Sequence, residues 1–298
     1  MKNINFSGTG VAMVTPFRKQ PETVDFSTLE SIIEELVEAK VSYIVALGTT
    51  SEAATMTPKE QQALQEFIVE TVDGRVPIVL GLGGNNTRAV TERIHETQFD
   101  GISGILSVTP YYNKPQQKGL VQHYKSVAEM SPVPVILYNV SGRTGCNLSA
   151  ESVLQLAEEC PNIAGVKEAS GNLNQVMEIL RNKPARLQVI SGDDALTLPM
   201  MAMGATGVIS VIANALPNEM VQMVNLALKD NIRKALPLHY RMLPLMHAIF
   251  EEGNPSGIKA LMEIQGKISS SLRLPLCKVS KQLYNKISTL YNVYKANS

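Results

Sequence analysis

Short apolar runs rich in β-branched residues alternate along the chain with longer amphipathic stretches. The runs are continuous and do not alternate with polar residues, which is typical of parallel strands that are covered on both faces. The pattern predicts eight strands, at residues 11–15, 43–47, 78–81, 104–108, 135–138, 164–167, 188–191 and 207–211.

The stretches between these runs predict helices whose first residues carry capping signals. The sequence TPKE at 57–60 matches a capping box with proline at the first helical position, and STLE at 27–30 matches a second box. We expect further helices to begin next to four polar sites, namely Asn86, Ser149, Asn172 and the pair Asp193-Asp194.

Eight successive strand–helix units predict an α/β fold of the (β/α)8 TIM-barrel type, which typically needs about 250 residues. The chain has 298 residues, and the sequence beyond 217 predicts only helices, divided by prolines at 237, 244, 255 and 275. We therefore expect a barrel over residues 1–225 and a C-terminal helical region, packed on the barrel, over residues 226–298. A doubly wound open sheet is the alternative that the strand pattern leaves open.

Composition and charge limit the possible partners. Lys and Arg together number 27, as do Asp and Glu, so no net charge attracts nucleic acid or an anionic membrane. No apolar run is long enough to span a bilayer, and residues 1–8 lack the apolar core of a signal peptide. The three cysteines form no CxxC pair, which favours a reducing cytoplasm. The four histidines lack zinc-binding spacing, so we expect no metal.

Polar segments follow five of the predicted strands, where the active sites of barrels lie. They are GTTSE at 48–52, TPYYN at 109–113, YNVSGRTG at 138–145, KEAS at 167–170 and SGDD at 191–194.

Lys167 is unusual because it ends the apolar run IAGV. One interpretation is a lysine that reaches the rim and pairs with a carboxylate such as that of Glu168. The other is a desolvated amine whose neutral form attacks a ketone. Nearby hydroxyl groups and the absence of a metal-binding pattern keep the second interpretation open.

The neighbouring polar residues each allow a structural and a functional interpretation. Tyr138 is either a core tyrosine or a proton shuttle, and the hydroxyl groups of Thr50 and Tyr112 could extend a relay. The turn GTT at 48–50 suits a carboxylate ligand, but it could also only cap a helix. Arg143 could clamp a carboxylate or form a surface salt bridge.

These segments, in this order and spacing, resemble the dihydrodipicolinate synthase/N-acetylneuraminate lyase family, and within it the synthase branch. The segments that carry the likeness are GTTSE, VTPYYNKP at 108–115, YNV with RTG, GVKEAS and SGDD, and it extends from Gly8 to LRLP at 272–275. The resemblance implies a (β/α)8 barrel with a C-terminal helical region. It also implies a homotetramer built as a dimer of dimers.

The resemblance further implies a chemistry without a cofactor, in which Lys167 forms a covalent Schiff base with pyruvate. The enzyme would then condense pyruvate with L-aspartate 4-semialdehyde, on the diaminopimelate route to lysine. Tyr138, Thr50 and Tyr112 match the proton relay of the family, with Tyr112 donated across a dimer interface.

Five residues match the substrate contacts of the family. Thr49 and Thr50 match the contacts to the carboxylate of pyruvate, and Arg143 matches the contact to the carboxylate of the semialdehyde. Gly192 and Ile209 match residues whose backbone carbonyls face the site.

The sequence departs from the family pattern at several positions. Ser51 replaces a glycine, which is tolerated if its φ is not positive. Ser141 replaces a proline, so we expect the loop that carries Arg143 to be less rigid. At the lysine-binding effector site of inhibited members, Asn85 and Tyr111 match, whereas two histidines and a glutamate are missing. We therefore expect weak or no feedback inhibition by lysine; the replacing residues are Pro58, Gln61 and Ala89.

The nearest alternative is a sister class I aldolase or lyase that acts on N-acetylneuraminate or a 2-keto-3-deoxy sugar acid. Arg143 and the pair Thr49-Thr50 argue against it, because neuraminate lyases usually carry Ser-Thr and lack this arginine. A non-catalytic barrel that binds a small acid would have lost Lys167 or Tyr138. A dinucleotide-dependent oxidoreductase would need a glycine fingerprint after the first strand, where the sequence is TPF.

Overall fold

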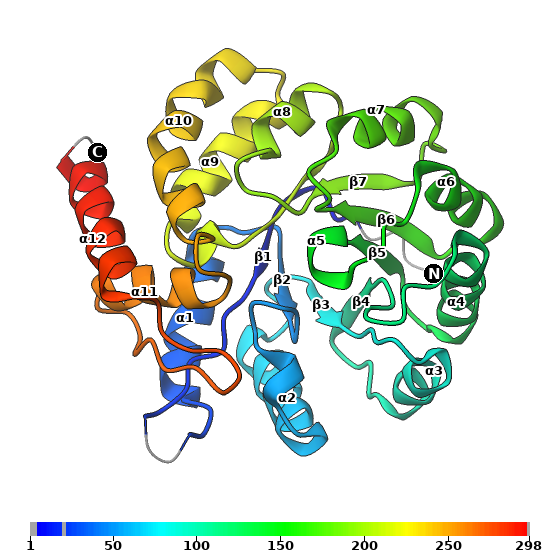
Figure 1. Cartoon of the computed structure of the whole chain (residues 1–298), viewed down its shortest axis with the longest axis horizontal. Helices are drawn as coiled ribbons and strands as arrows, with labels where there is room; N and C mark the ends of the chain where they lie inside the picture. Colours follow the sequence, from blue (N-terminus) through cyan, green and yellow to red (C-terminus); the bar gives the residue numbers. More distant parts are fainter. Residues whose placement is uncertain (1–4, 20–21, 297–298) are drawn as a thin grey trace.

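The computed structural model describes residues 5–19 and 22–296, and its centre is a closed parallel barrel (Figure 1). The strands pair in chain order, and β1 pairs with β8 to close the ring, so the predicted TIM barrel is confirmed and the open sheet is excluded. The strands are β1 Gly8–Ala12, β2 Tyr43–Ala46, β3 Ile78–Gly81, β4 Ile102–Val108, β5 Val135–Asn139, β6 Ile163–Glu168, β7 Gln188–Ser191 and β8 Gly207–Ser210.

Helices surround the barrel and continue beyond it at the C-terminal end. Those between and directly after the strands are α1 Phe26–Glu38, α2 Pro58–Val72, α3 Thr87–Glu96, α4 Gln117–Met130, α5 Ser141–Thr144, α6 Ala150–Glu159, α7 Leu173–Asn182, α8 Thr197–Ala202 and α9 Pro217–Leu228, with the 3-10 turns η1 Ala53–Thr55 and η2 Ile212–Asn214. The last three are α10 Ile232–Ala248, α11 Ser256–Ile264 and α12 Lys281–Ala296. Figure 1 shows α12 at the outer edge of the molecule, beside α10 and α11.

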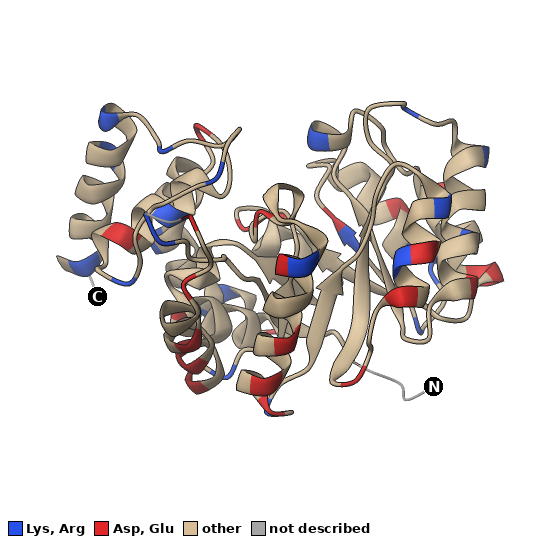
Figure 2. Cartoon of the chain, turned by 90° about the horizontal axis from the view of Figure 1, so that it is seen from below, with Lys and Arg blue, Asp and Glu red and all other residues tan. Residues whose placement is uncertain are grey.

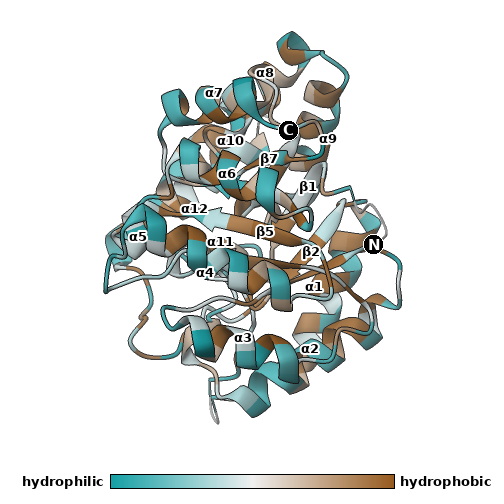
Figure 3. Cartoon of the chain, turned by 90° about the vertical axis from the view of Figure 1, so that its right-hand side faces the viewer, coloured by the Kyte–Doolittle hydropathy of each residue, from teal (hydrophilic) through white to brown (hydrophobic). Residues whose placement is uncertain are grey.

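The strands form the core because both of their faces are covered. Every residue of β2 and of β5 is buried. Figure 3 shows hydrophobic colour along β5 and hydrophilic colour on the outward surfaces of the surrounding helices. Charged residues lie mainly on helices and loops (Figure 2), so a lysine at a strand end is an exception to the general pattern.

Most predicted helix starts are confirmed. Thr57 and Glu60 form a complete capping box: the Thr57 hydroxyl accepts from the backbone N–H of Glu60, and the Glu60 carboxylate accepts from that of Thr57. Asn86, Ser149 and Asn172 cap α3, α6 and α7 through their side chains. These signals are local, which explains why the sequence alone revealed them.

Two predicted helix starts are wrong. Helix α1 begins before the predicted box at 27–30, because Asp25 accepts from both the backbone N–H and the hydroxyl of Thr28, at 3.3 and 2.9 Å. Helix α8 begins only at Thr197. The carboxylate of Asp193 accepts from the backbone N–H groups of the turn before this helix, at Ala195 and Leu196.

The first strand was predicted at 11–15 but lies at Gly8–Ala12. Glycines at 8 and 10 obscured its start, because glycine is depleted in strands. The neighbouring strand requires a glycine at position 10, because an added Cβ would lie 2.2 Å from Cε2 of Tyr43. We expected no signal peptide in residues 1–8. Residues 1–4 of this segment lie outside the described residues.

Two of the four prolines expected to divide the C-terminal region do not do so. Pro237 and Pro244 lie inside α10, although proline removes a backbone donor from a helix interior. Helix α10 contacts α8, α9 and α12 and buries six of its residues, and this packing offsets the local penalty. The division of the chain at residue 225 remains a prediction. No helix within residues 5–19 and 22–296 is long and apolar enough to cross a membrane.

A buried ion pair joins α11 to the loop that follows β2. Both side chains, Lys259 and Glu52, are completely buried, and the ammonium also donates to the carbonyl of Ser271 at 2.9 Å. It lies 4.5 Å from the ring centroid of Phe17. Burial lowers the pKa of Lys259, and the Glu52 carboxylate opposes this shift.

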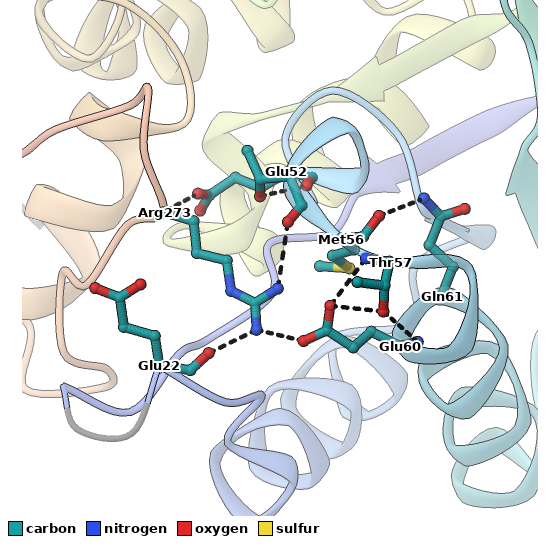
Figure 4. A network of polar contacts seen from close by, with 8 residues as sticks. Glu22, Glu52, Met56, Thr57, Glu60, Gln61 and Arg273 are labelled. Carbon is teal, nitrogen blue, oxygen red and sulfur yellow. Dashed lines mark hydrogen bonds and ion pairs between the residues drawn. The ribbon is translucent and has the colours of Figure 1, made fainter.

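Arg273 strengthens the same junction (Figure 4). Its backbone N–H donates to the Glu52 carboxylate at 3.1 Å, and its guanidinium donates to the Glu60 carboxylate at 2.5 Å. The guanidinium also reaches the carbonyl of Glu22 at 2.6 Å. The hydrogen bond from Arg273 lowers the pKa of Glu60 to about 2. Residues 259–273 are therefore fastened to the loop after β2 and to the start of α2.

Removing the cation of the buried pair should destabilise the fold. We expect Lys259→Met to lower the free energy of unfolding by about 3–5 kcal/mol, because Glu52 is left buried without its counter-charge. Urea unfolding followed by circular dichroism measures the change. The double variant Lys259→Met with Glu52→Gln should recover most of the loss, because Gln is uncharged and still accepts from Arg273. A double variant no more stable than Lys259→Met would contradict this account.

Candidate active site

The barrel register brings Lys167 next to Tyr138. The two residues are direct partners in the pairing of β5 with β6. Both are almost completely buried, and Nζ of Lys167 lies 4.4 Å from the ring centroid of Tyr138. Each ends an apolar run, so the parallel strands deliver both side chains to the same end of the barrel.

The strand period separates Lys167 from its neighbour Glu168. Successive side chains of a strand point to opposite faces, so Lys167 lines the barrel cavity whereas Glu168 faces the helix layer. The Glu168 carboxylate accepts from Nδ2 of Asn139, Nε2 of Gln175 and the backbone N–H of Ser170, at 3.0, 2.9 and 2.8 Å. Its hydrogen-bonding capacity is used there. In the part of the chain that the structure describes, no carboxylate forms an ion pair with Lys167.

A cavity of about 210 Å³ lies at the C-terminal ends of the strands. It brings together six of the eight site residues predicted from the sequence, namely Thr49, Thr50, Tyr138, Arg143, Lys167 and Gly192. The cavity therefore combines a buried amine, three hydroxyl groups and a guanidinium.

Gly192 leaves the space that the Lys167 side chain occupies. An added Cβ at this position would lie 3.0 Å from Cε of Lys167 and 2.6 Å from Cβ of Ala169. A larger residue would therefore clash with Ala169 and crowd the Lys167 side chain. Ile209 is buried in β8 but does not line the cavity, so the contact expected from its carbonyl remains a prediction.

Tyr112 does not join the other predicted relay residues. Its side chain is 88% exposed and does not line the cavity. Its backbone has a φ of 76°, which is uncommon for a residue other than glycine, and its N–H donates to the carbonyl of Thr144 at 3.4 Å. The tyrosine ring is thus presented outward from this chain.

Arg143 lies at the mouth of the cavity, on the short helix α5. It also lines a second cavity of about 420 Å³, which shares Thr49 and Tyr138 with the first. Within the described residues it forms no ion pair, so the predicted alternative of a surface salt bridge is not observed. Its guanidinium is available for the carboxylate of a ligand.

The loop after β2 holds Thr50 in the wall of the cavity. Thr50 is 2% exposed, and its Oγ1 accepts a hydrogen bond from Nδ2 of Asn254 at 2.9 Å. The φ of Ser51 is not positive, as expected for a serine in place of glycine, and its hydroxyl lies 2.7 Å from that of Thr15. The next residue, Glu52, takes the left-handed conformation with a φ of 58°.

Phe250 and Asn254, which follow α10, are among the cavity residues that the sequence did not reveal. Neither lies at a strand end, where the active-site residues of barrels are expected. The only local signal is the turn-like sequence GNPSG at 253–257, which carries no catalytic meaning by itself.

Asp194 supports the cavity from outside its lining. Its buried carboxylate accepts from the backbone N–H groups of Val211 and Ile212, at 3.1 and 2.8 Å, and so ties the end of β7 to the residues after β8. Burial raises the pKa of this carboxyl to about 6.

Two of the predicted effector positions line the second cavity, and a third contacts one of them. Gln61 and Tyr111 line it, and Nδ2 of Asn85 donates to the carbonyl of Tyr111 at 3.2 Å. Arg93 also lines this cavity, and its Nη2 donates to Oε1 of Gln61 at 3.3 Å. A positive charge therefore lies beside one of the positions where inhibited members carry histidine.

Among the residues that the structure describes, no three His, Cys, Asp or Glu side chains are arranged to hold a metal ion.

Comparisons with known proteins agree over nearly the whole chain. The model of the dihydrodipicolinate synthetase family matches residues 5–293. A 4-hydroxy-tetrahydrodipicolinate synthase from Parabacteroides distasonis is 48% identical over 287 residues, which cover 96% of this chain and 96% of that protein.

Solved structures of similar proteins share the fold. Dihydrodipicolinate synthase from Aquifex aeolicus is 38% identical, with a TM-score of 0.94 over 97% of this chain and 98% of that one. A dihydrodipicolinate synthase variant described as monomeric is 34% identical, with a TM-score of 0.94 over 97% of both chains.

The raised pKa of Asp194 predicts a pH-dependent contribution to stability. Between about pH 4 and pH 6 the folded chain binds more protons at this carboxyl than the unfolded chain, so its contribution to stability falls as the pH rises. We expect the stability of the wild type relative to Asp194→Asn to fall by about 3 kcal/mol over this window. Urea unfolding at a series of pH values measures the difference, and a difference independent of pH would contradict the assignment.

Proposed function

The chain belongs to the dihydrodipicolinate synthetase family, and on this premise we propose how its cavity performs the reaction. The chain is a lyase that condenses pyruvate with L-aspartate 4-semialdehyde to 4-hydroxy-tetrahydrodipicolinate, a step of lysine biosynthesis. One observation carries the assignment of the site: Lys167 is buried in the cavity wall beside the hydroxyl-bearing ring of Tyr138, and no carboxylate of residues 5–19 and 22–296 forms an ion pair with it.

The first half of the reaction uses the amine of Lys167 as a nucleophile. The neutral amine attacks the ketone carbon of pyruvate, and loss of one water leaves an iminium that joins Nζ to the former ketone carbon. The iminium then loses a proton from the methyl group and becomes an enamine. No separate cofactor is needed, because the covalent Schiff base stores the electron pair.

The second half forms the carbon–carbon bond and closes the ring. The enamine carbon adds to the aldehyde carbon of the semialdehyde, and the aldehyde oxygen takes up a proton. The amino group of the semialdehyde then attacks the iminium carbon and displaces Lys167. The ring closes and the free amine is restored, so one water leaves in total.

Several of these steps move a proton, and Tyr138 is the group placed to do so. It lies beside Lys167 in the same cavity, which Thr50 in the loop after β2 also lines. Tyr112 would complete the relay from a second copy of the chain, which agrees with its outward position. General acid–base help of this kind is worth about 10²–10⁴-fold in rate.

The two carboxylates of the substrates need separate contacts. Thr49 and Thr50, which both line the cavity, offer hydroxyl and backbone donors to the carboxylate of pyruvate. Arg143, at the mouth, offers a forked guanidinium to the carboxylate of the semialdehyde. This arginine favours the semialdehyde over the sugar-derived substrates of the sister lyases.

The proposal includes a homotetrameric assembly and a cytoplasmic location. A homotetramer, built as a dimer of dimers, would place Tyr112 in the cavity of a neighbouring copy. A similar protein is described as monomeric, so the assembly requires its own measurement. A cytoplasmic location agrees with the three cysteines, all of which are free.

Product formation tests the reaction directly. We expect turnover of pyruvate with L-aspartate 4-semialdehyde and none with N-acetylmannosamine, because Arg143 binds the carboxylate of the semialdehyde and N-acetylmannosamine has no carboxylate. Lys167→Ala should abolish turnover and the pyruvate adduct that borohydride traps, whereas Tyr138→Phe should slow turnover at least about 100-fold and keep the fold.

The matched control for Lys167→Ala is Lys259→Met, which removes the other buried lysine but should still allow the adduct in the folded fraction. Full activity of Lys167→Ala would contradict the Schiff-base mechanism. Turnover of N-acetylmannosamine alone would move the chain to the sister lyases.

Lysine should inhibit the chain weakly or not at all. The sequence lacks the acidic partner of the effector site, because position 89 is alanine, and the Arg93 guanidinium in the second cavity repels the ammonium of lysine near Gln61. Initial rates measured with increasing L-lysine should therefore stay unchanged up to about 1 mM. Half-inhibition at or below this concentration would refute the prediction.

A further inference from the structure

We infer that Asn254 is a positioning residue that sets the direction of the hydrogen bond made by the Thr50 hydroxyl. This inference rests on the proposed function, because it concerns how the catalytic cavity handles protons. Asn254 lines the cavity, is almost completely buried, and donates from Nδ2 to Oγ1 of Thr50 at 2.9 Å.

The hydrogen-bonding capacity of the Thr50 hydroxyl limits where its proton can point. A threonine hydroxyl has one proton to donate and two lone pairs that accept. Because the amide N–H of Asn254 occupies a lone pair of Thr50, the Thr50 proton is left to point elsewhere. Among the described residues the Thr50 hydroxyl makes no second hydrogen bond, so its proton can point into the cavity that Tyr138 and Lys167 also line.

The direction matters for the relay. If Thr50 donates toward the oxygen of Tyr138, the phenolic proton of Tyr138 is free to point at Lys167 and its adduct. If the Asn254 amide were turned round, its oxygen would accept the Thr50 proton and the relay would run the opposite way. The orientation of one side-chain amide thus decides which group in the cavity is the donor.

The neighbouring ion pair fixes the distance between Asn254 and Thr50. Lys259, five residues beyond Asn254, pairs with Glu52, two residues beyond Thr50. The two contacts cross the same junction between α11 and the loop after β2. A buried charge pair cannot slide without exposing an uncompensated charge, so the amide is held against the hydroxyl.

A substitution with nearly the same shape separates this role from simple packing. Asn254→Asp keeps the size but can only accept, so it takes the Thr50 proton away from the cavity. Asn254→Ala removes the contact and leaves the Thr50 hydroxyl free to donate its hydrogen bond in any direction. We expect kcat to fall about 100-fold in Asn254→Asp and only about tenfold in Asn254→Ala. A packing role predicts the reverse order.

A double-mutant cycle with Thr50→Val shows whether Asn254 acts through Thr50. Valine has no proton to direct, so adding Asn254→Asp to Thr50→Val should change kcat less than about threefold. An undiminished 100-fold loss in this background would show that the aspartate acts on Lys167 by its charge, and the inference would be overturned. If Asn254→Asp unfolds in thermal scans, the same cycle is measured with Asn254→Ala. The tenfold loss of kcat caused by Asn254→Ala should then be absent in the Thr50→Val background.

The wild-type enzyme separates failure of this inference from failure of the function. If borohydride traps pyruvate on Lys167 and the semialdehyde is turned over, the function stands whatever the cycle shows. If the wild type fails both assays, the proposed function falls, and the inference falls with it.

Discussion

A buried ammonium–carboxylate pair between Lys259 and Glu52 determines where the C-terminal helices meet the barrel. Both side chains have no exposure to water, so each charge depends on the other and on the surrounding hydrogen bonds from Arg273 and to Ser271. Separating the pair would leave a charge in an apolar environment, which is far more costly than losing a surface salt bridge. The loop that carries Thr49 and Thr50 is therefore fixed from a distant part of the chain.

The second constraint is the register of the closed barrel. The pairing of β5 with β6 sets Tyr138 beside Lys167, and the alternation of side chains sends Asn139 and Glu168 into the helix layer. Glu168 is saturated by neutral donors there, so a negative charge adjacent in sequence does not neutralise the amine. Gly192 in the neighbouring segment gives the lysine its space. The expected reactivity of Lys167 thus depends both on keeping the Glu168 carboxylate away from the amine and on placing Tyr138 beside it.

Sequence reasoning succeeded where the signal was local or periodic. Continuous apolar runs located the strands, and side-chain caps such as Thr57 and Ser149 located helix starts. It failed where packing overrides local preference, as in α10, which continues through Pro237 and Pro244. Asn254 could not be found because its contact with Thr50 spans 204 positions and leaves no local pattern. The predicted relay role of Tyr112 is not tested by a single chain, in which its side chain is exposed.

The junction between Glu52 and Lys259 also bears on how the chain is made. The two residues are separated by 207 positions, so Glu52 leaves the ribosome long before its partner is synthesised. Until then its carboxylate must remain hydrated, which keeps the loop after β2 open to water. The wall of the cavity is complete only after Phe250 and Asn254, the last of its lining residues along the chain, have been synthesised. A nascent chain that already contains Lys167 therefore has the nucleophile before it has the dry cavity in which that amine reacts.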